Sequence, residues 1–414
     1  MKKLLVLGAG TAGTMAVNKL RRHLDRDEWN ITIVDADPIH QYQPGYLFIP
    51  FGAYEPGEVT KATAQFIPKG VELLMGEIAA VDTDANQVRM ADDTLLDYDQ
   101  LIIATGTHPR PDQTEGLDSD EYGRTIHDFY SLDGAIALRD SLAKWEGGRL
   151  VINIVEMPIK CPVAPLEFAF LADGFFTERN MRDDVQITYV TPLDAAFTKP
   201  VAAKQLGGML DDRDIALEPD FMVMEVDTDR KMLVSYDERE IAYDLLVTIP
   251  TNMGADFVGE SGLGDELNHV KVDKHTFLAV GQDNVFALGD AAALPTSKAG
   301  SVAHFAVDVF VDNFLNHIEG RPMTHEFDGH ANCFVESGNG KGLLLDFNYD
   351  TQPLMGKYPV PHVGPFSLLK ETAVNHQGKL MFKWIYWNML LRGRPMPLPV
   401  EMSMSGKIAE ESVK

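Results

Sequence analysis

Cysteine, long apolar runs and positive charge are all scarce in this chain of 414 residues. Its two cysteines, Cys161 and Cys333, are too few for a disulfide scaffold or a four-thiolate metal site, but they suffice for one redox pair. No window approaches about 18 uninterrupted apolar residues, so we expect no transmembrane helix. The apolar run in the opening MKKLLVLGAG is too short for a secretory signal, and we expect none.

Lysine and arginine together number 36, against 62 aspartates and glutamates, which gives a formal net charge of −26 at pH 7. A surface this acidic repels phosphate backbones, so nucleic acid is not expected as a partner. It also disfavours adhesion to anionic lipid, unless a local patch reverses the sign. Hydrophobic residues make up 45% of the chain and charged residues 24%, a balance that excludes a disordered protein.

Short apolar strands alternate with helical stretches along the chain. Residues 4–7 form a continuously apolar strand, followed by a glycine turn, a helix and a second strand that ends at Asp35, which together make a βαβ unit. Further strands are expected at 149–155, 185–192 and 284–294. The predicted fold class is therefore α/β with mainly parallel sheets.

Two βαβ starts, near residues 3 and 149, predict two interleaved Rossmann-like domains and a separate C-terminal region. The acidic stretches 112–121 and 211–220 are expected to be solvated loops. The expected boundaries are 1–110 and 266–320 for the first domain, 111–265 for the second, and 321–414 for the C-terminal region.

The motif Gly8-x-Gly10-x-x-Gly13 lies directly between a strand and a helix. The first glycine permits a tight turn, the second lets the backbone approach a pyrophosphate, and the third lets the helix pack closely on the strand. The helix N-terminus then offers free N–H groups to the phosphates. Asp35, 22 residues beyond Gly13, is placed to accept hydrogen bonds from a ribose. We therefore predict a dinucleotide site, to which Thr11, Ala12 and Ala36 also belong; a merely tight turn is the alternative.

Two distant segments resemble motifs of flavoproteins with two dinucleotide-binding domains. LIIATGTHPRP resembles their second motif, with Ala104, Thr105 and Gly106 as its ATG, and NVFALGDAA resembles their C-terminal motif, with Gly289 and Asp290. This resemblance implies FAD as the cofactor, with the aspartate on its ribityl chain. In the loop after Asp35, Pro44 and Tyr46 are candidates for lining the flavin, although ordinary packing explains them equally well.

A second glycine-rich loop is missing after the strand at 149–155. The chain reads RLVINIVEMPIKCPVAPLEF there, and no glycine falls between Gly148 and Gly174. Because nothing in this turn can cradle a second pyrophosphate in the usual way, we do not expect NAD(P)H as the reductant.

These residues narrow the resemblance to the family of sulfide:quinone oxidoreductases and flavocytochrome c sulfide dehydrogenases. In that family one cysteine lies in this strand-to-helix turn and a second meets it over the flavin, positions matched by Cys161 and Cys333. PTSKAGSVAHFA resembles the segment whose lysine, here Lys298, reaches the flavin, and KWIYWNMLLRGRPMP resembles the C-terminal end of quinone-reducing members. The resemblance implies that sulfide is oxidised to sulfur or polysulfide at a Cys161–Cys333 redox pair, and that two electrons pass through FAD to a membrane quinone. Resemblance to related quinone reductases implies that Glu167 relays a proton.

Several alternatives stay open. The cysteines could be small buried hydrophobes, Lys298 a surface charge, and Glu167 a residue favoured by the helix dipole. Many family members carry a third cysteine where this chain has His127, so a covalent cysteinyl bond to the flavin is excluded there. The rival functions are the flavin subunit of a sulfide dehydrogenase with a cytochrome acceptor, an enzyme like type II NADH:quinone oxidoreductase, and a non-enzymatic redox sensor. His127, His304 and His330 lack metal-like spacing.

The C-terminal region reverses the charge of the chain locally. Between Phe366 and Arg394 five basic residues face one acid, Glu371, for a local charge of +4. The apolar, aromatic stretch from Leu380 to Leu391 is too short to cross a bilayer but suits an interfacial helix, with a buried core helix as the alternative. We therefore expect a peripheral protein of a prokaryotic inner membrane that meets the membrane surface through this region. A homo-oligomer is left open.

Overall fold

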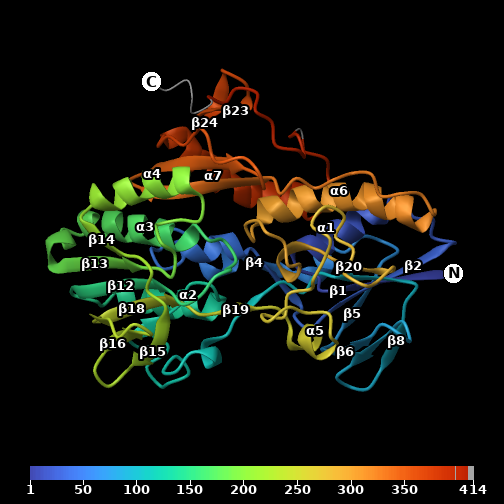
Figure 1. Ribbon diagram of the computed structural model, residues 1–414, viewed down its shortest axis with the longest axis horizontal. Helices are drawn as coiled ribbons and strands as arrows, with labels where there is room; N and C mark the ends of the chain where they lie inside the picture. Colours follow the sequence, from blue (N-terminus) through green and yellow to red (C-terminus); the bar gives the residue numbers. More distant parts are fainter. Residues whose placement is uncertain (397, 409–414) are drawn as a thin grey trace.

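The computed structural model describes residues 1–396 and 398–408, and its long axis carries two lobes bridged by the C-terminal region (Figure 1). One lobe is built on the first strands of the chain and the other on the middle strands. The C-terminal sheet and helix α7 (Ala373–Ile385) lie across the top of both lobes in this view.

The first lobe contains a parallel five-stranded sheet in the order β20-β9-β1-β2-β5. Its central strand is apolar and buried from Leu4 onward, as expected of a strand covered on both faces. Helices α1 (Thr11–Leu20) and α6 (Gly300–Ile318) pack against each other on this lobe. The strands are β1 (Lys2–Leu7), β2 (Trp29–Asp35), β5 (Glu72–Met75), β9 (Gln100–Ile103) and β20 (Val285–Ala287).

The return of β20 to the edge beside β9 places the turn at Gly289 next to the turn that begins at Ala104. Two motifs that are far apart in the sequence therefore meet at the carboxyl end of the sheet, where ligands of parallel α/β sheets bind.

The second lobe contains another parallel five-stranded sheet, in the order β11-β18-β12-β13-β14. Its strands are β11 (Ile126–His127), β12 (Gly148–Ile154), β13 (Val185–Val190), β14 (Ile215–Glu218) and β18 (Leu245–Ile249), and its helices are α2 (Leu132–Leu142), α3 (Ala164–Glu178) and α4 (Pro200–Asp211). The expectation of a solvated loop over 211–220 was wrong at β14, because Ile215 is buried and pairs with Ile187 on β13.

The C-terminal region forms a four-stranded sheet in the order β21-β22-β24-β23, with α7 packed on it. These strands are β21 (Ala331–Gly338), β22 (Lys341–Phe347), β23 (Gly356–Val360) and β24 (Gly364–Leu368). Helix α3 of the second lobe also contacts β21. Since α3 follows the turn of Cys161 and β21 carries Cys333, this contact brings the two cysteine-bearing segments together.

Shorter elements complete the molecule. They are β3 (Ile39–Gln41), β4 (Thr60–Ala62), β6 (Ile78–Asp82), β7 (Gln87–Met90), β8 (Leu95–Asp97), β10 (His108–Pro109), β15 (Val223–Asp227), β16 (Met232–Ser235), β17 (Glu240–Ala242), β19 (Asn252–Met253) and α5 (Asp256–Glu260). The predicted α/β class with parallel sheets is confirmed, while the domain boundaries stay predictions.

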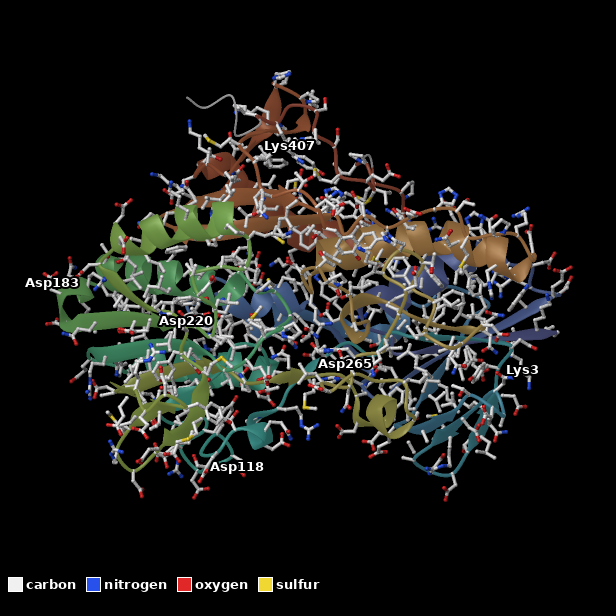
Figure 2. All side chains as sticks on the ribbon, viewed as in Figure 1. Lys3, Asp118, Asp183, Asp220, Asp265 and Lys407 are labelled. Atoms are coloured by element: carbon white, nitrogen blue, oxygen red, sulfur yellow. The ribbon has the colours of Figure 1, made fainter. Side chains whose placement is uncertain are left out.

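Acidic side chains such as Asp118 and Asp183 lie exposed at the edge of the second lobe (Figure 2). Among the described residues no helix combines the length and apolarity needed to span a bilayer. The stretch predicted as an interfacial helix is split, because Tyr386 and Trp387 are buried inside the protein while Met381 and Trp384 are exposed. After Ile385 the helix continues as one π-helical turn, Tyr386–Leu390.

Candidate active site

A cavity of about 870 Å³ lies at the carboxyl end of the first sheet and extends to the turn after β12. Among its lining residues are most of those that the sequence singled out, namely Gly8, Gly10, Thr11, Ala12, Asp35, Ala36, Pro44, Tyr46, Ala104, Thr105, Gly106, Cys161, Glu167, Gly289, Asp290 and Lys298. Gly13 and Cys333 are not among the lining residues.

The glycine turn after β1 has the geometry that its sequence predicts. Gly8 adopts φ +98°, and a Cβ there would lie 2.5 Å from the Ala104 carbonyl oxygen. A Cβ at Gly13 would lie 1.9 Å from the Gly8 carbonyl oxygen, so α1 packs on the turn without room for a side chain. A Cβ at Gly10 would meet nothing within 4 Å, which leaves the backbone there open to a ligand.

Asp35 holds the glycine turn from the end of β2. Its carboxylate accepts hydrogen bonds from the backbone N–H of Ala9 at 2.6 Å and of Asp37 at 2.8 Å. The acid therefore ties the turn to the neighbouring strand while it lines the cavity.

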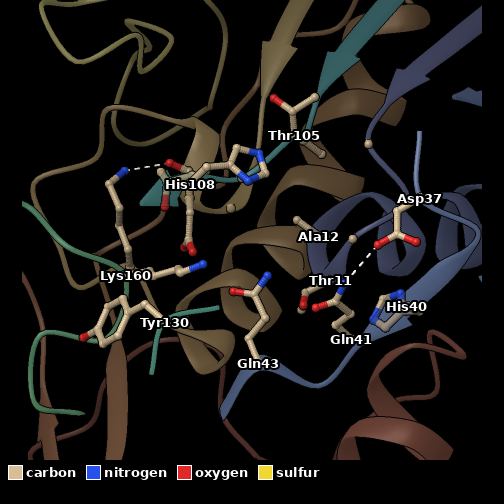
Figure 3. A pocket seen from close by; sticks show the side chains of 18 of the residues that line it. Thr11, Ala12, Asp37, His40, Gln41, Gln43, Thr105, His108, Tyr130 and Lys160 are labelled. Carbon is tan, nitrogen blue, oxygen red and sulfur yellow. Dashed lines mark hydrogen bonds between the residues drawn. The ribbon is translucent and has the colours of Figure 1, made fainter. Parts of the chain in front are cut away.

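The residues present fit FAD. Beyond the open backbone at Gly10, the buried hydroxyls of Thr105 and Thr107 line the cavity and have no hydrogen-bond partner within the described structure. Polar atoms buried without a partner are costly, so their position at the cavity wall indicates a polar ligand. Thr11 and Asp37 lie at one end of the cavity, and Tyr130 and Lys160 at the other (Figure 3).

Cys161 occupies the turn between β12 and α3 with φ +78°, a backbone region rarely used by residues with a side chain. Its N–H donates to the Lys298 carbonyl at 2.8 Å, and its own carbonyl accepts from Tyr130 Oη at 3.0 Å. The turn is therefore held from two sides.

Cys333 lies on β21 opposite Leu345, and both cysteines are partly buried free thiols. Burial raises the pKa of the Cys161 thiol to about 12, an effect increased by Glu167 and opposed by Lys379. Burial also raises the pKa of Cys333, and the charge of Cys161 raises it further, which places the two sulfurs in one electrostatic environment.

Glu167, in the first turn of α3, is fully buried and forms an ion pair with Lys379 of α7. Its Oε1 also accepts the N–H of Glu336 at 2.5 Å, whereas its Oε2 has no partner among the described residues. Burial raises the pKa of Glu167 and Lys379 opposes this. Burial would lower the pKa of Lys379, but Glu167 and Cys161 together raise it.

Lys379 also donates to the Phe334 carbonyl at 3.0 Å, so it connects α3 with the strand of Cys333. The sequence placed Lys379 in a basic surface patch, and only its spacing on an amphipathic helix could have suggested an inward direction. Lys383, from the same patch, pairs with Glu58 at 2.8 Å. The local positive charge is thus partly neutralised by acids from other segments.

Lys298 is only 6% exposed, which excludes the alternative of a surface charge. Its Nζ donates to the carbonyl oxygens of Asp290 at 2.7 Å and Ala292 at 3.0 Å. Burial lowers the pKa of Lys298 to about 8, against the opposing effect of the Asp290 carboxylate.

The buried Tyr386 connects the C-terminal region to the glycine turn. Its hydroxyl lies 2.7 Å from Thr11 Oγ1 and 2.7 Å from His40 Nε2, and His40 Nδ1 lies 3.1 Å from the Ala9 carbonyl oxygen. Burial lowers the pKa of His40 to about 4, so the ring is neutral at pH 7. Since a carbonyl only accepts, Nδ1 carries the proton and Nε2 accepts from Tyr386. The sequence contained no signal for this contact.

The histidines singled out in the sequence form no group with other ligands that could hold a metal, among the residues that the structure describes. His127 is buried in β11 with Nε2 3.0 Å from the Arg124 carbonyl oxygen, and His330 contacts Asp346 at 2.8 Å.

The pyridine nucleotide-disulphide oxidoreductase family model matches residues 2–143. The mitochondrial sulfide:quinone oxidoreductase of Dictyostelium discoideum is 26% identical over 398 residues, covering 95% of this chain and 86% of the relative, and that of Mus musculus is 26% identical over 94% and 86%. The solved sulfide:quinone oxidoreductase of Aquifex aeolicus shares the fold, with a TM-score of 0.81 and 19% identity over 95% of this chain and 92% of the other. The chain is thus an FAD flavoprotein oxidoreductase that is similar over nearly its whole length to sulfide:quinone oxidoreductases.

Proposed function

We propose that the protein oxidises sulfide at a Cys161–Cys333 redox pair and passes two electrons through FAD to a quinone. The observation that carries this proposal is the packing of α3 against β21, which brings the strand of Cys333 against the helix that follows Cys161, a residue that lines the FAD cavity. The turn that would hold a second dinucleotide carries Cys161 instead of glycines.

The first chemical step takes place between sulfide and the disulfide form of the pair. HS⁻ attacks one sulfur, the S–S bond breaks, and the products are a persulfide on one cysteine and a thiolate on the other. When the disulfide forms again, the added sulfur leaves at oxidation state zero, with one proton and two electrons. When bound, FAD takes up two electrons and returns them to a quinone. Burial disfavours the thiolate, as the raised pKa values of both thiols indicate, and so favours its oxidation.

Glu167 would hold and release protons in this reaction at its unpartnered Oε2. Burial raises the pKa of this carboxyl above its usual range, and its position at the cavity wall lets it serve a reacting group. Lys379 balances the charge each time the proton leaves.

A quinone would enter from lipid through the C-terminal region. Val374, Met381 and Trp384 are 46%, 50% and 60% exposed and follow one another at seven and three positions, so they share one face of α7. Phe382 lies behind this face against the cavity wall, where a Cβ at Gly300 would meet its ring at 3.8 Å. An apolar helix face of this kind suits the surface of a membrane.

Anaerobic stopped-flow spectroscopy tests the function directly. Sulfide should bleach the flavin absorbance of the purified holoprotein within the time of turnover, and a soluble quinone should restore it, whereas NADH should leave it unchanged. A flavin that stays oxidised in the presence of sulfide would contradict the proposed function. Flotation with vesicles, compared between the wild type and Met381→Glu/Trp384→Glu, tests the membrane contact.

A further inference from the structure

Lys160 is a buried lysine in the cavity that none of the functions above uses. It directly precedes Cys161, its N–H donates to Asn252 Oδ1 at 3.2 Å, and its backbone pairs with Lys298 across an isolated bridge. Only 9% of the residue is exposed, yet it lines the cavity. Figure 3 shows its side chain directed into the cavity, at the end far from Thr11 and Asp37. The backbone therefore fixes where this amine can reach.

The amine of Lys160 makes no hydrogen bond or ion pair with any residue that the structure describes, unlike that of Lys298, which is engaged by two carbonyl oxygens. Burial lowers the pKa of Lys160, while the more distant carboxylates of Asp290 and Asp128 oppose this. His108 also lines the cavity, and burial together with the charge of Lys160 lowers the pKa of its imidazole. A buried amine without a close partner is costly unless a ligand supplies the complementary charge.

The position of Lys160 decides which part of FAD it can serve. The glycine turn already offers its backbone and the helix N-terminus to the pyrophosphate, at the opposite end of the cavity. Lys160 instead adjoins the redox cysteine, so it belongs to the end where electrons enter. A flavin ring system that takes up two electrons and one proton carries one more negative charge than before. In a buried site that charge interacts strongly with a nearby ammonium.

We propose that Lys160 contacts the redox-active ring system of FAD and stabilises the negative charge that the ring system gains on reduction. The reduced cofactor and the ammonium form of Lys160 stabilise each other, because a new negative charge nearby favours the protonated amine. Lys160 thereby sets how readily FAD accepts electrons, a property distinct from the sulfur chemistry of the neighbouring Cys161.

The test is the midpoint potential of FAD in the holoprotein variant Lys160→Met, measured against a reference dye with dithionite as the reductant. We expect the variant to bind reduced FAD about tenfold more weakly relative to oxidised FAD, equivalent to a potential about 30 mV lower for a two-electron couple. Lys160→Arg should restore most of the potential, and the exposed control Lys204→Met should leave it at the wild-type value.

An unchanged potential in Lys160→Met, or equal weakening of both oxidation states of FAD, would show a packing role and overturn the inference. If Lys160→Met does not retain FAD, Lys160→Gln is measured in the same way under excess FAD. In this titration dithionite supplies the electrons, so the result does not depend on sulfide as the substrate. If the wild-type protein fails to react with sulfide, the proposed function is wrong, but a lowered potential in Lys160→Met still supports this inference.

Discussion

Each large sheet has a buried strand that is followed by a helix, after a short turn at Gly8 in the first lobe and a longer turn that contains Cys161 in the second. Both residues have a left-handed backbone, with φ +98° and +78°. At Gly8 the absent side chain lets the backbone pass close to Ala104. At Cys161 the same backbone carries a thiol. One turn therefore leaves its backbone open to a ligand, and the other presents a thiol.

The helices that follow these turns differ in the charge of their first turns. The first turn of α1 contains no acidic residue, so its N–H groups and dipole are available to a phosphate. The first turn of α3 contains the buried Glu167, whose carboxylate is paired with Lys379 of α7. The second turn thus differs from the first in two ways, the loss of the glycines and the carboxylate in the first turn of the helix that follows.

Removal of either thiol should produce the largest effect, because it removes one of the two sulfurs proposed to react with sulfide and leaves the glycine turn of the first lobe unchanged. Cys161→Ser and Cys333→Ser should each lower the rate of sulfide-driven flavin reduction by at least about 10³-fold, while FAD stays bound. Stopped-flow rates and the flavin content of the purified variants check this. Full activity in either variant would refute the pair.

Removal of the cation beside Glu167 tests how much the second turn depends on buried charge. Lys379→Met leaves the fully buried carboxylate without its partner and should lower the free energy of unfolding by about 3–5 kcal/mol. The double variant Glu167→Gln/Lys379→Met should recover part of this loss in denaturant titrations. The matched control Lys383→Met breaks a more exposed pair and should cost less than about 1 kcal/mol. Equal losses in Lys379→Met and the control would contradict the assignment.

Acid should weaken the first lobe through His40. Its pKa is about 4 in the folded protein and 6.5 when exposed, so between these values the unfolded chain binds more protons. The contribution of His40 to the free energy of unfolding is therefore fully present above pH 6.5. It decreases by about 3 kcal/mol as the pH falls to 4. His40→Gln should flatten this part of the curve of unfolding free energy against pH. A profile that keeps its slope in the variant would assign the acid sensitivity to other groups.

The smallest expected effect comes from adding one methyl group to the first turn. Gly8→Ala must adopt φ +98° and approach Ala104, which should cost about 1–3 kcal/mol and weaken FAD binding accordingly. Gly10→Ala has open space around its Cβ and should retain FAD nearly as well as the wild type. Fluorescence titration of the apoprotein with FAD compares the two. Similar affinities would show that the turn is not as tightly packed as its geometry implies.

The parts of the site that could be predicted depend on short-range patterns. Gly8, Gly13 and Asp35 belong to one βαβ unit, whose spacing alone brings them to the end of one sheet. The prediction of a loop over 211–220 was wrong because the apolar residues of β14 are few and lie among acidic residues. The sequence left open whether the segment of Lys379 and Tyr386 is interfacial or buried, because the partners that bury these two residues, Glu167 and His40, come from distant segments.

The sequence by itself determined the α/β class, the dinucleotide turn and the loss of its counterpart after β12, because each follows from local spacing and residue type. Only the tertiary structure decided which groups surround the sulfurs. It brings α3, β21 and α7 together, buries the Glu167–Lys379 pair between them, and directs Lys160 into the cavity. Charges and thiols acquire their reactivity from burial and from neighbours, and a linear pattern specifies neither.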